Sequence, residues 1–232
     1  MLPDLVNGSM LDAPLAGQSL RAEVRERLRR AIMQGTLKPG EQIVESRLAR
    51  QLGISQAPVR EALRELEQMG LVVNHTRRGT FVRELSPHDA WEMYTLRAQL
   101  ESMAARLALP HLTDADFDAM EQLIDAMAEA GRQGDVDALT TADARFHEYL
   151  CERSGHRLLL RTWRSIHPLN WTQLTVAVLN RDLVELAERH REILDALRGR
   201  DIAAIQRAVE HHLMSVGEEV IRDLETGLDA DP

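Results

Sequence analysis

The stretch from Val44 to Val82 restricts the possible folds of this chain more than any other part of its sequence. Val44, Leu48 and Leu52 recur at i, i+4 and i+8, which predicts a short helix with one apolar face. Gly53 follows at once, and helices commonly end at glycine because it accepts a positive φ. We therefore expect a short helix and a tight turn before the next element.

A second helix is expected to begin at Ser55, whose hydroxyl is suited to accept a hydrogen bond from the backbone N–H of Ala57. Val59, Leu63 and Leu66 form its apolar stripe, so its other face is left to solvent. Two helices joined in this way, with arginine exposed on the second, favour insertion of the second helix into the major groove of DNA. The residues expected to contact DNA from this helix are Ser55, Gln56, Ala57, Arg60 and Arg64.

Two short strands are predicted next, over residues 71–75 and 80–83, on either side of a turn. The turn contains Arg77, Arg78 and Gly79, and adjacent arginines at a hairpin tip favour contact with phosphates or the minor groove. The alternative for such a turn is a charged loop that contacts only solvent. Directly after a helix pair of this kind, the hairpin instead predicts the wing of a winged helix-turn-helix domain.

The region from Leu20 to Arg83 resembles the N-terminal domain of the GntR family of bacterial transcription regulators, most specifically in the motif PVREAL at residues 58–63. The resemblance implies operator DNA as the partner and Arg60 as a residue that contacts it. It also implies that the first turn of the second helix approaches the bases and that the wing near Gly79 enters the minor groove.

One position departs from the family pattern. Many relatives carry Ser-Arg-Thr before the proline, whereas this chain has Ser-Gln-Ala at residues 55–57. Glutamine pairs with adenine where arginine reads guanine, so Gln56 predicts an operator that differs from the family's common one. The alternative is that Gln56 is only a solvated residue at the start of the helix.

Charge divides the chain into two parts. Residues 1–85 carry 13 basic and 10 acidic side chains, and the remainder carries 15 and 27 of the chain's 28 and 37. A basic head beside an acidic remainder concentrates the affinity for DNA in the head. We expect a disordered tail over residues 1–17, the winged helix-turn-helix domain over 18–85 and a second domain over 86–232.

Two further features of the sequence indicate the cellular compartment of the protein. The single cysteine, Cys151, excludes an internal disulfide and is typical of a reducing compartment. No apolar run approaches the ~18 residues of a membrane span, and no signal peptide is recognisable. The sequence therefore predicts a cytoplasmic protein without a membrane partner.

Residues 86–232 have the pattern of helices throughout. Breaks are expected near Pro110, Gly155, Pro168 and Asn180, and no alternating strand pattern occurs between them. The predicted fold class is mainly α: an N-terminal winged helix-turn-helix followed by an all-α antiparallel bundle of six or seven helices.

Four polar residues interrupt the apolar stripes of three predicted helices. Asp143 and His147 lie one turn apart on the first, His190 lies in the second stripe and His212 in the third, whereas His211 is expected to face solvent. Burying these groups without partners would cost several kcal/mol. A shared divalent ion such as Zn²⁺ or Ni²⁺ would satisfy the imidazoles and the carboxylate together. The alternative is a water-filled polar cavity without metal.

The C-terminal part resembles the ligand-binding domain of the FadR-type (FCD) branch of the GntR family, in segments 143–147 and 188–197 and around His212. Its length resembles the six-helix VanR-like subgroup more than the seven-helix one. In metal-binding members, an aspartate, the histidine four residues later and two further histidines coordinate a divalent ion. The resemblance therefore implies the metal ligands Asp143, His147, His190 and His212, and a small organic acid as effector.

Arg97 is the residue expected to bind that acid. It shares a predicted helix face with Met93, Leu100 and Ala104, which places it inside the bundle. A guanidinium that faces a bound metal would hold a carboxylate from both sides. The alternative is an Arg97–Glu101 ion pair on the surface.

We therefore expect a homodimeric DNA-binding regulator, a repressor, whose C-terminal domain binds a divalent metal and a small carboxylate that modulates operator binding. One alternative is a metal-responsive regulator in which the ion is the signal. Another is a metal-dependent hydrolase, since an aspartate and three histidines can activate water on a metal. No glutamate stands out beside the four ligands in the sequence, which argues against a hydrolase.

Overall fold

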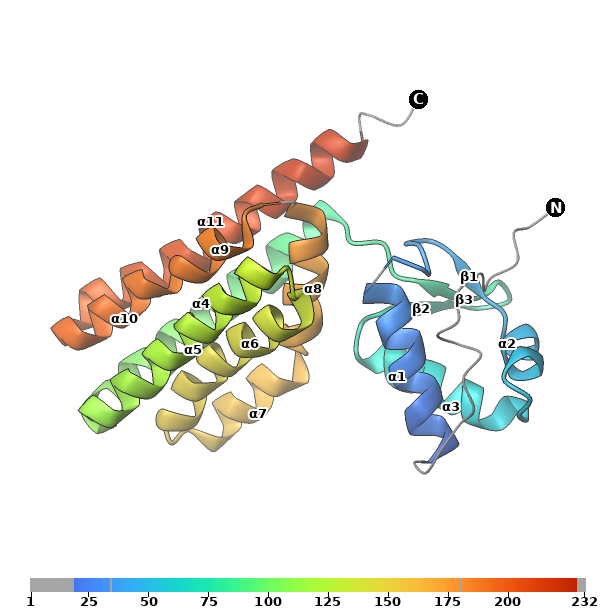
Figure 1. Cartoon of the computed structure of the whole chain (residues 1–232), viewed down its shortest axis with the longest axis horizontal. Coiled ribbons are helices and arrows are strands. Elements are labelled where there is room, and N and C mark those ends of the chain that lie inside the picture. Colours follow the sequence, from blue (N-terminus) through green and yellow to red (C-terminus); the bar gives the residue numbers. More distant parts are fainter. Residues whose placement is uncertain (1–18, 34, 180, 229–232) are drawn as a thin grey trace. The chain divides into compact units, whose positions relative to one another are not determined.

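The computed structural model describes residues 19–33, 35–179 and 181–228, and the predicted tail at residues 1–17 lies outside them. The chain forms two compact units that divide between Glu84 and Leu85. Figure 1 shows helices with a small sheet in the first unit and helices throughout the second, which confirms the mainly α fold class. No described helix has the length and apolar character needed to cross a membrane.

The N-terminal unit contains the two predicted helices, a preceding helix and a three-stranded sheet. The sheet is antiparallel in the order β1-β3-β2. Its strand β1 has only two residues and was not predicted from the sequence. The elements in chain order are α1 (Leu20–Met33), β1 (Gln42–Ile43), α2 (Glu45–Gln51), α3 (Gln56–Gln68), β2 (Val72–His75) and β3 (Gly79–Val82).

In the turn between α2 and α3, Gly53 has the conformation predicted for it, but Ser55 does not make the predicted capping hydrogen bond. Gly53 has a φ of +66°, as expected of a glycine that ends a helix. Ser55 occupies the N-cap of α3, yet its side chain makes no capping hydrogen bond, so the expected bond to Ala57 is wrong. Val59 and Leu66 of α3 are fully buried, which fixes the opposite face of the helix toward solvent.

The wing is a tight hairpin. Its register pairs Val72 with Val82 and His75 with Gly79, so residues 76–78 form the tip. Arg77 and Gly79 have φ values of +66° and +100°, and the second of these is a conformation that favours glycine.

The C-terminal unit is a helical bundle. Helices α9 and α10 are separated only by Arg189, whose φ of −56° and ψ of −24° are still helical. Counted as one, they give seven α-helices among the described residues, which agrees with the predicted six or seven. In chain order the helices are α4 (Pro87–Ala108), α5 (Asp114–Gln133), α6 (Val136–Arg153), α7 (Arg157–Ser165), α8 (Pro168–Leu179), α9 (Leu183–Glu188), α10 (His190–Gly199) and α11 (Ile202–Leu228), with a 3-10 turn at Leu109–His111.

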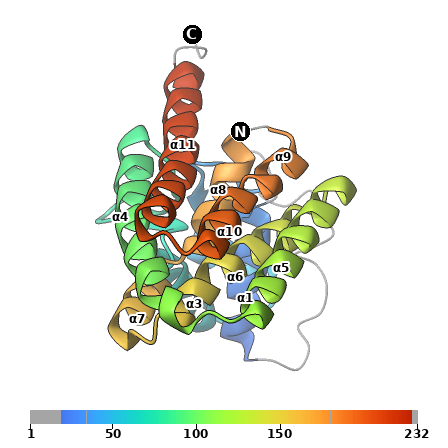
Figure 2. The same cartoon turned by 90° about the vertical axis from the view of Figure 1, so that its left-hand side faces the viewer.

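Local signals set where these helices begin. At α4, the Ser86 hydroxyl accepts from the backbone N–H of Asp89 at 3.1 Å, and the Asp89 carboxylate accepts from the backbone N–H of Ser86 at 3.1 Å. At α6, Asp135 accepts from the backbone N–H of Ala138 at 2.9 Å. Figure 2 shows α4 and α11 running side by side, and the two helices pack against each other.

Gly217 marks a close approach of α11 to α4. A Cβ at this position would lie 2.8 Å from the Cβ of Tyr94. Alanine stabilises a helix by up to ~1 kcal/mol over glycine, but overpacking of this kind costs about 1–3 kcal/mol. We expect Gly217→Ala to lower the free energy of unfolding, measured by urea denaturation. Gly199→Ala, which meets no atom within 4 Å, is expected to raise it by ~0.4–1 kcal/mol. An equal rise in the free energy of unfolding for both variants would contradict the tight packing of Gly217 against Tyr94.

Candidate functional site

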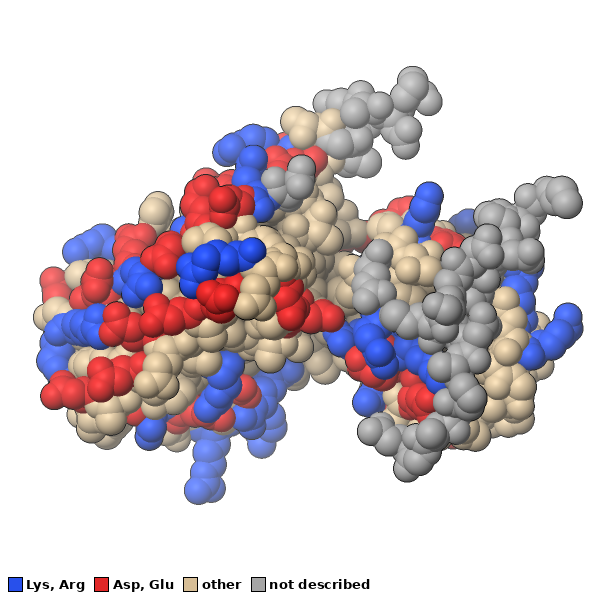
Figure 3. Space-filling model, in the orientation of Figure 1, with Lys and Arg blue, Asp and Glu red and all other residues tan. Residues whose placement is uncertain are grey.

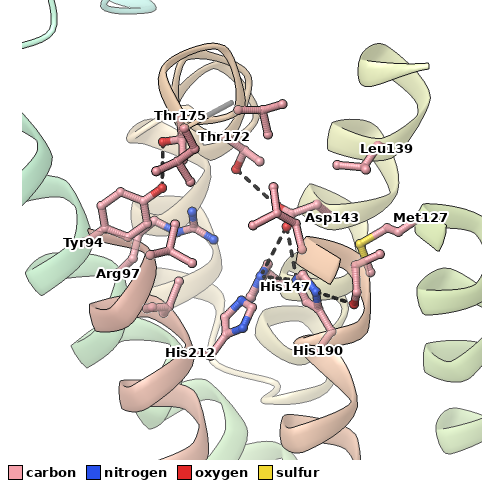
Figure 4. A pocket seen from close by; sticks show the side chains of 16 residues that line it. Tyr94, Arg97, Met127, Leu139, Asp143, His147, Thr172, Thr175, His190 and His212 are labelled. Atoms are coloured by element: carbon pink, nitrogen blue, oxygen red, sulfur yellow. Dashed lines mark hydrogen bonds and ion pairs between the residues drawn. The ribbon is translucent and has the colours of Figure 1, made fainter. Parts of the chain in front are cut away.

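Four predicted side chains meet inside the C-terminal unit, as Figure 4 shows: Asp143 and His147 from α6, His190 from α10 and His212 from α11. All four are buried, and ring nitrogens of the three histidines lie within 4.8 Å of one another. Oδ1 of Asp143 lies 3.1 Å from Nε2 of His190 and 3.9 Å from Nε2 of His147. The structure thus brings together all four residues expected to bind a metal.

Polar contacts on the far side of two rings direct their lone pairs toward one another. Nδ1 of His190 lies 3.0 Å from the carbonyl oxygen of Ala187, and Nδ1 of His147 lies 2.5 Å from Oε2 of Glu101. A carbonyl and a carboxylate can only accept, so both contacts favour hydrogen on Nδ1, although that of His147 is a close ion-pair contact without hydrogen-bond geometry. In a neutral imidazole of this form, Nε2 carries the lone pair. These two Nε2 atoms are 3.2 Å apart. Such an arrangement needs a cation between them, either a proton or a metal ion.

His212 is a neutral member of the cluster. Burial lowers the pKa of its imidazole well below the ordinary value, and the charges of His190 and His147 act in the same direction. Its Nδ1 is buried and has no hydrogen-bond partner among the residues that the structure describes. A buried polar atom without a partner costs about 1–3 kcal/mol. A metal ion bound at Nδ1 would remove this cost.

Asp143 supplies negative charge. Burial acts to raise the pKa of its carboxyl group, but in the metal-free protein the close contact with His190 and the positive charge of the proton held by the histidines outweigh burial and hold the pKa below the ordinary aspartate value. The hydroxyl of Thr172 donates to Oδ2 at 3.1 Å. Oδ1 therefore remains directed at the histidines. An ionised carboxylate with neutral imidazoles is a donor set that suits Zn²⁺ or Ni²⁺.

A cavity of about 40 Å³ adjoins the cluster. This volume exceeds the roughly 10–15 Å³ that one buried water needs. Its lining combines apolar side chains, which include Met127, Leu139, Leu179 and Val216, with the polar side chains of the cluster and Arg97. The hydroxyls of Tyr94 and Thr175, which also line it, lie 2.7 Å apart, and burial raises the pKa of Tyr94 to about 12.

Arg97 lines the cavity, as its helix face predicted, and Figure 4 shows its guanidinium pointing into the same space as the histidines. Its Nε donates to Oε1 of Glu101 at 2.9 Å. The ion pair considered as the alternative therefore exists, but it is buried, with only 3% of the arginine side chain exposed. Nη2 of Arg97 is buried and has no hydrogen-bond partner among the described residues. The guanidinium thus keeps a donor for an anion.

Glu101 is a buried residue of this site that was not predicted from the sequence. The expectation that no glutamate lies beside the ligands is wrong, since Glu101 contacts His147 directly. Burial acts to raise the pKa of its carboxyl group, but the charges of Arg97 and His147 outweigh burial and hold that pKa well below the ordinary glutamate value. Glu101 is not among the residues that line the cavity. The sequence did place Glu101 four residues after Arg97, and therefore on the same face of the predicted helix, which could have indicated that the two side chains lie together.

The residues expected to contact DNA are all exposed: Ser55, Gln56, Ala57, Arg60 and Arg64 on α3, and Arg77, Arg78 and Gly79 at the wing. Nε of Arg60 donates to Oε2 of Glu45 in α2 at 3.0 Å, yet 52% of the arginine side chain remains exposed. At the wing, the carbonyl of Arg78 accepts from Nε2 of Gln42 at 2.7 Å. Figure 3 shows acidic side chains interspersed with basic ones over the visible face of the C-terminal unit.

Comparison with known proteins identifies relatives of both units. Residues 20–82 match the family described as bacterial regulatory proteins, gntR family, and residues 92–215 match the FCD domain. A protein of Paenarthrobacter nicotinovorans, named "Probable D-xylose utilization operon transcriptional repressor", is 34% identical over 86% of this chain and 88% of its own length. The HTH-type transcriptional repressor RspR of Escherichia coli K12 is 28% identical over 88% and 90%. The crystal structure of a GntR transcriptional regulator from Rhodococcus sp. RHA1 is 26% identical, covers 93% of this chain and 100% of its own, and has a TM-score of 0.71.

Proposed function

This chain belongs to the GntR family of bacterial regulatory proteins and carries an FCD domain, and we propose that a divalent metal ion and a small carboxylate bind in its C-terminal cavity. The protein is a DNA-binding transcription regulator and not an enzyme. The two bound ligands would modulate its binding to operator DNA. We propose further that it is a cytoplasmic homodimeric repressor. Its two reading helices would then contact half-sites ~10 base pairs apart. We assign the contacts to the bases to α3 and the contacts to phosphates and the minor groove to the wing.

The proposed metal site is supported chiefly by two histidine nitrogens whose lone pairs face each other. The Nε2 atoms of His147 and His190 lie 3.2 Å apart, each with its Nδ1 facing an acceptor, and the Asp143 carboxylate lies beside them. These two histidines, Asp143 and His212 are the proposed ligands. When bound, the ion would supply positive charge that attracts an anion in the adjoining cavity.

The proposed effector is a small organic acid. The donor Nη2 of Arg97 and a bound metal ion would attract the two oxygens of one carboxylate from different sides. The Tyr94 and Thr175 hydroxyls can bond a hydroxyl of the same molecule. A sugar acid, a hydroxy acid or a dicarboxylate fits this description. An effector changes operator binding only by the difference in its affinity for two conformations of the protein.

Removal of the metal tests the first half of the proposal. A ligand at about 1,000 times its Kd stabilises a protein by ~4 kcal/mol, which for a chain of this size is about 8–16 °C in Tm. We expect Zn²⁺-loaded protein to melt higher than EDTA-treated protein by roughly this amount, measured by calorimetry. Equal melting temperatures would contradict the metal site and support a water-filled cavity. Operator binding that follows metal concentration, with no response to carboxylates at saturating metal, would instead support the ion as the signal.

Arg97→Lys tests the carboxylate site. Lysine keeps the positive charge beside Glu101 but loses the planar fork of donors. A hydrogen bond to a charged group is worth about 1.5–3 kcal/mol, so we expect the apparent affinity for stabilising carboxylates to fall at least ~10-fold at saturating Zn²⁺. A thermal-shift titration with a panel of small carboxylates measures this. Arg106→Lys, on an exposed position of the same helix, is the control and is expected to behave as wild type. An unchanged response of Arg97→Lys would remove Arg97 from the site.

A further inference from the structure

Glu101 lies at the centre of a buried group of contacts behind the cavity. Only 1% of its side chain is exposed. Its Oε1 accepts from Nε of Arg97 at 2.9 Å and from the indole N–H of Trp163 in α7 at 2.9 Å. Its Oε2 lies 2.5 Å from Nδ1 of His147. One carboxylate thus contacts a proposed metal ligand, the proposed anion-binding residue and a third helix.

The close ion-pair contact of Oε2 with Nδ1 favours the form of His147 that carries hydrogen on Nδ1. A carboxylate that faces Nδ1 stabilises the form with hydrogen on Nδ1, which leaves the Nε2 lone pair directed at Asp143 and His190. A neutral imidazole with its hydrogen on Nε2 could not coordinate a metal through that atom. The orientation and the form of this ring both depend on Glu101.

The Oε1 contact fixes the guanidinium of Arg97. It engages Nε, which is the donor nearest the helix, and leaves Nη2 buried and without a described partner. The indole of Trp163, itself buried, donates to the same oxygen and prevents the carboxylate from rotating away from either partner. The positions of the arginine and of the histidine are therefore set by one side chain.

We propose that Glu101 is a positioning residue shared by the metal site and the anion site, holding His147 through Oε2 and Arg97 through Oε1. This inference rests on the proposed function. It goes beyond it in making the two binding events depend on one group that contacts neither ligand. Disturbing Glu101 is therefore expected to weaken both the binding of metal and the binding of carboxylate, although Glu101 does not line the cavity.

Glu101→Gln is the sharpest variant because it changes the hydrogen-bonding character with little change in shape. With the amide oxygen held by Arg97 and Trp163, the amide NH₂ faces Nδ1 of His147. That nitrogen must then accept, which places the ring hydrogen on Nε2. Loss of a partner behind a metal-bound histidine typically weakens metal affinity by ~10–100-fold, and we expect a loss in this range for Zn²⁺, measured by competition with a chromophoric chelator.

The same variant tests whether the role is shared. At a Zn²⁺ concentration that saturates both proteins, we expect acetate to stabilise wild type against heat and to stabilise Glu101→Gln at least ~10-fold more weakly. Glu92→Gln makes the same chemical change at an exposed site of α4 and is expected to match wild type in both assays. Wild-type Zn²⁺ affinity in Glu101→Gln, or weaker Zn²⁺ binding with an unaltered acetate response, would overturn the inference. Wild-type protein that binds no Zn²⁺ would overturn the proposed function and the inference with it.

A measurement on the wild type covers the case in which Glu101→Gln does not fold. In metal-free protein at about pH 8, above the ordinary histidine pKa, ¹⁵N chemical shifts report which ring nitrogen carries the hydrogen. The signal of His147 is identified by its loss in His147→Gln. We expect hydrogen on Nδ1, whether or not Nε2 also shares a proton with His190, and hydrogen on Nε2 alone would overturn the inference.

Discussion

Replacing His212 by leucine is expected to weaken metal binding by roughly 100-fold and to leave the metal-free protein as stable as wild type or more stable. The apparent binding free energy of a structural zinc ion is about 10–16 kcal/mol, so one ligand of four contributes ~3 kcal/mol. Without metal, leucine removes a buried nitrogen that has no partner among the described residues, and this relieves up to ~1–3 kcal/mol. Zn²⁺ titration and urea denaturation in EDTA measure the two effects.

The neighbouring histidine provides the control for this experiment. The His211 side chain is 69% exposed, as the sequence predicted, and its Nδ1 lies 3.1 Å from Glu192. His211→Leu is expected to keep wild-type Zn²⁺ affinity. Unchanged metal affinity in His212→Leu would exclude this residue from the site. A large loss of stability in EDTA would show that His212 has a partner other than the proposed metal.

Replacing Arg60 by alanine is expected to abolish most of the specific binding to operator DNA. A good contact between arginine and DNA is worth about 1–3 kcal/mol, and a homodimer loses it at both half-sites, so specific affinity should fall at least ~30-fold. Arg60 is exposed near the start of α3, and its only described ion pair is with Glu45 on the surface. Fluorescence anisotropy with operator and random duplexes at one salt concentration measures the specific and non-specific affinities.

Two variants separate reading of the operator from attraction to phosphate. Arg77→Ala at the wing is expected to weaken operator and random DNA alike and to lower the salt dependence by about one phosphate contact per protomer. Arg106→Ala, exposed in the C-terminal unit, should change neither. If Arg60→Ala lost affinity for both duplexes equally, the assignment of α3 as the reading helix would be wrong.

Much of the fold could be predicted because local signals mark it. Gly53 adopts the positive φ that its position required, and the break predicted near Gly155 lies between α6 and α7. The buried faces of α6, α10 and α11 could be predicted from the helical period of 3.6 residues. The same period showed that Asp143 and the three histidines lie on those buried faces. Strand β1 was missed because two residues are too few to show a period.

The role of Glu101 could not be predicted for a different reason. Its partner Trp163 lies 62 residues further along the chain, and no local pattern records that contact. Helix α4 also exposes apolar side chains at Trp91, Leu96 and Met103, so its apolar pattern does not separate a buried face from a surface one. The sequence was therefore compatible with an Arg97–Glu101 pair on the surface and with one in the interior. Only the packing of α4 against α6 and α7 shows that the pair is buried.

The central claim is that this protein recognises particular DNA sites and that its C-terminal cavity controls the recognition. Recovery and sequencing of genomic fragments bound by the full-length protein, at near-physiological salt, test it most directly. We expect enrichment of a few sites with two half-sites, loss of these sites with Arg60→Ala, and genes beside them that narrow the effector to one class of carboxylate. Uniform recovery of fragments that falls steeply with salt would show attraction to phosphate alone and would contradict the account.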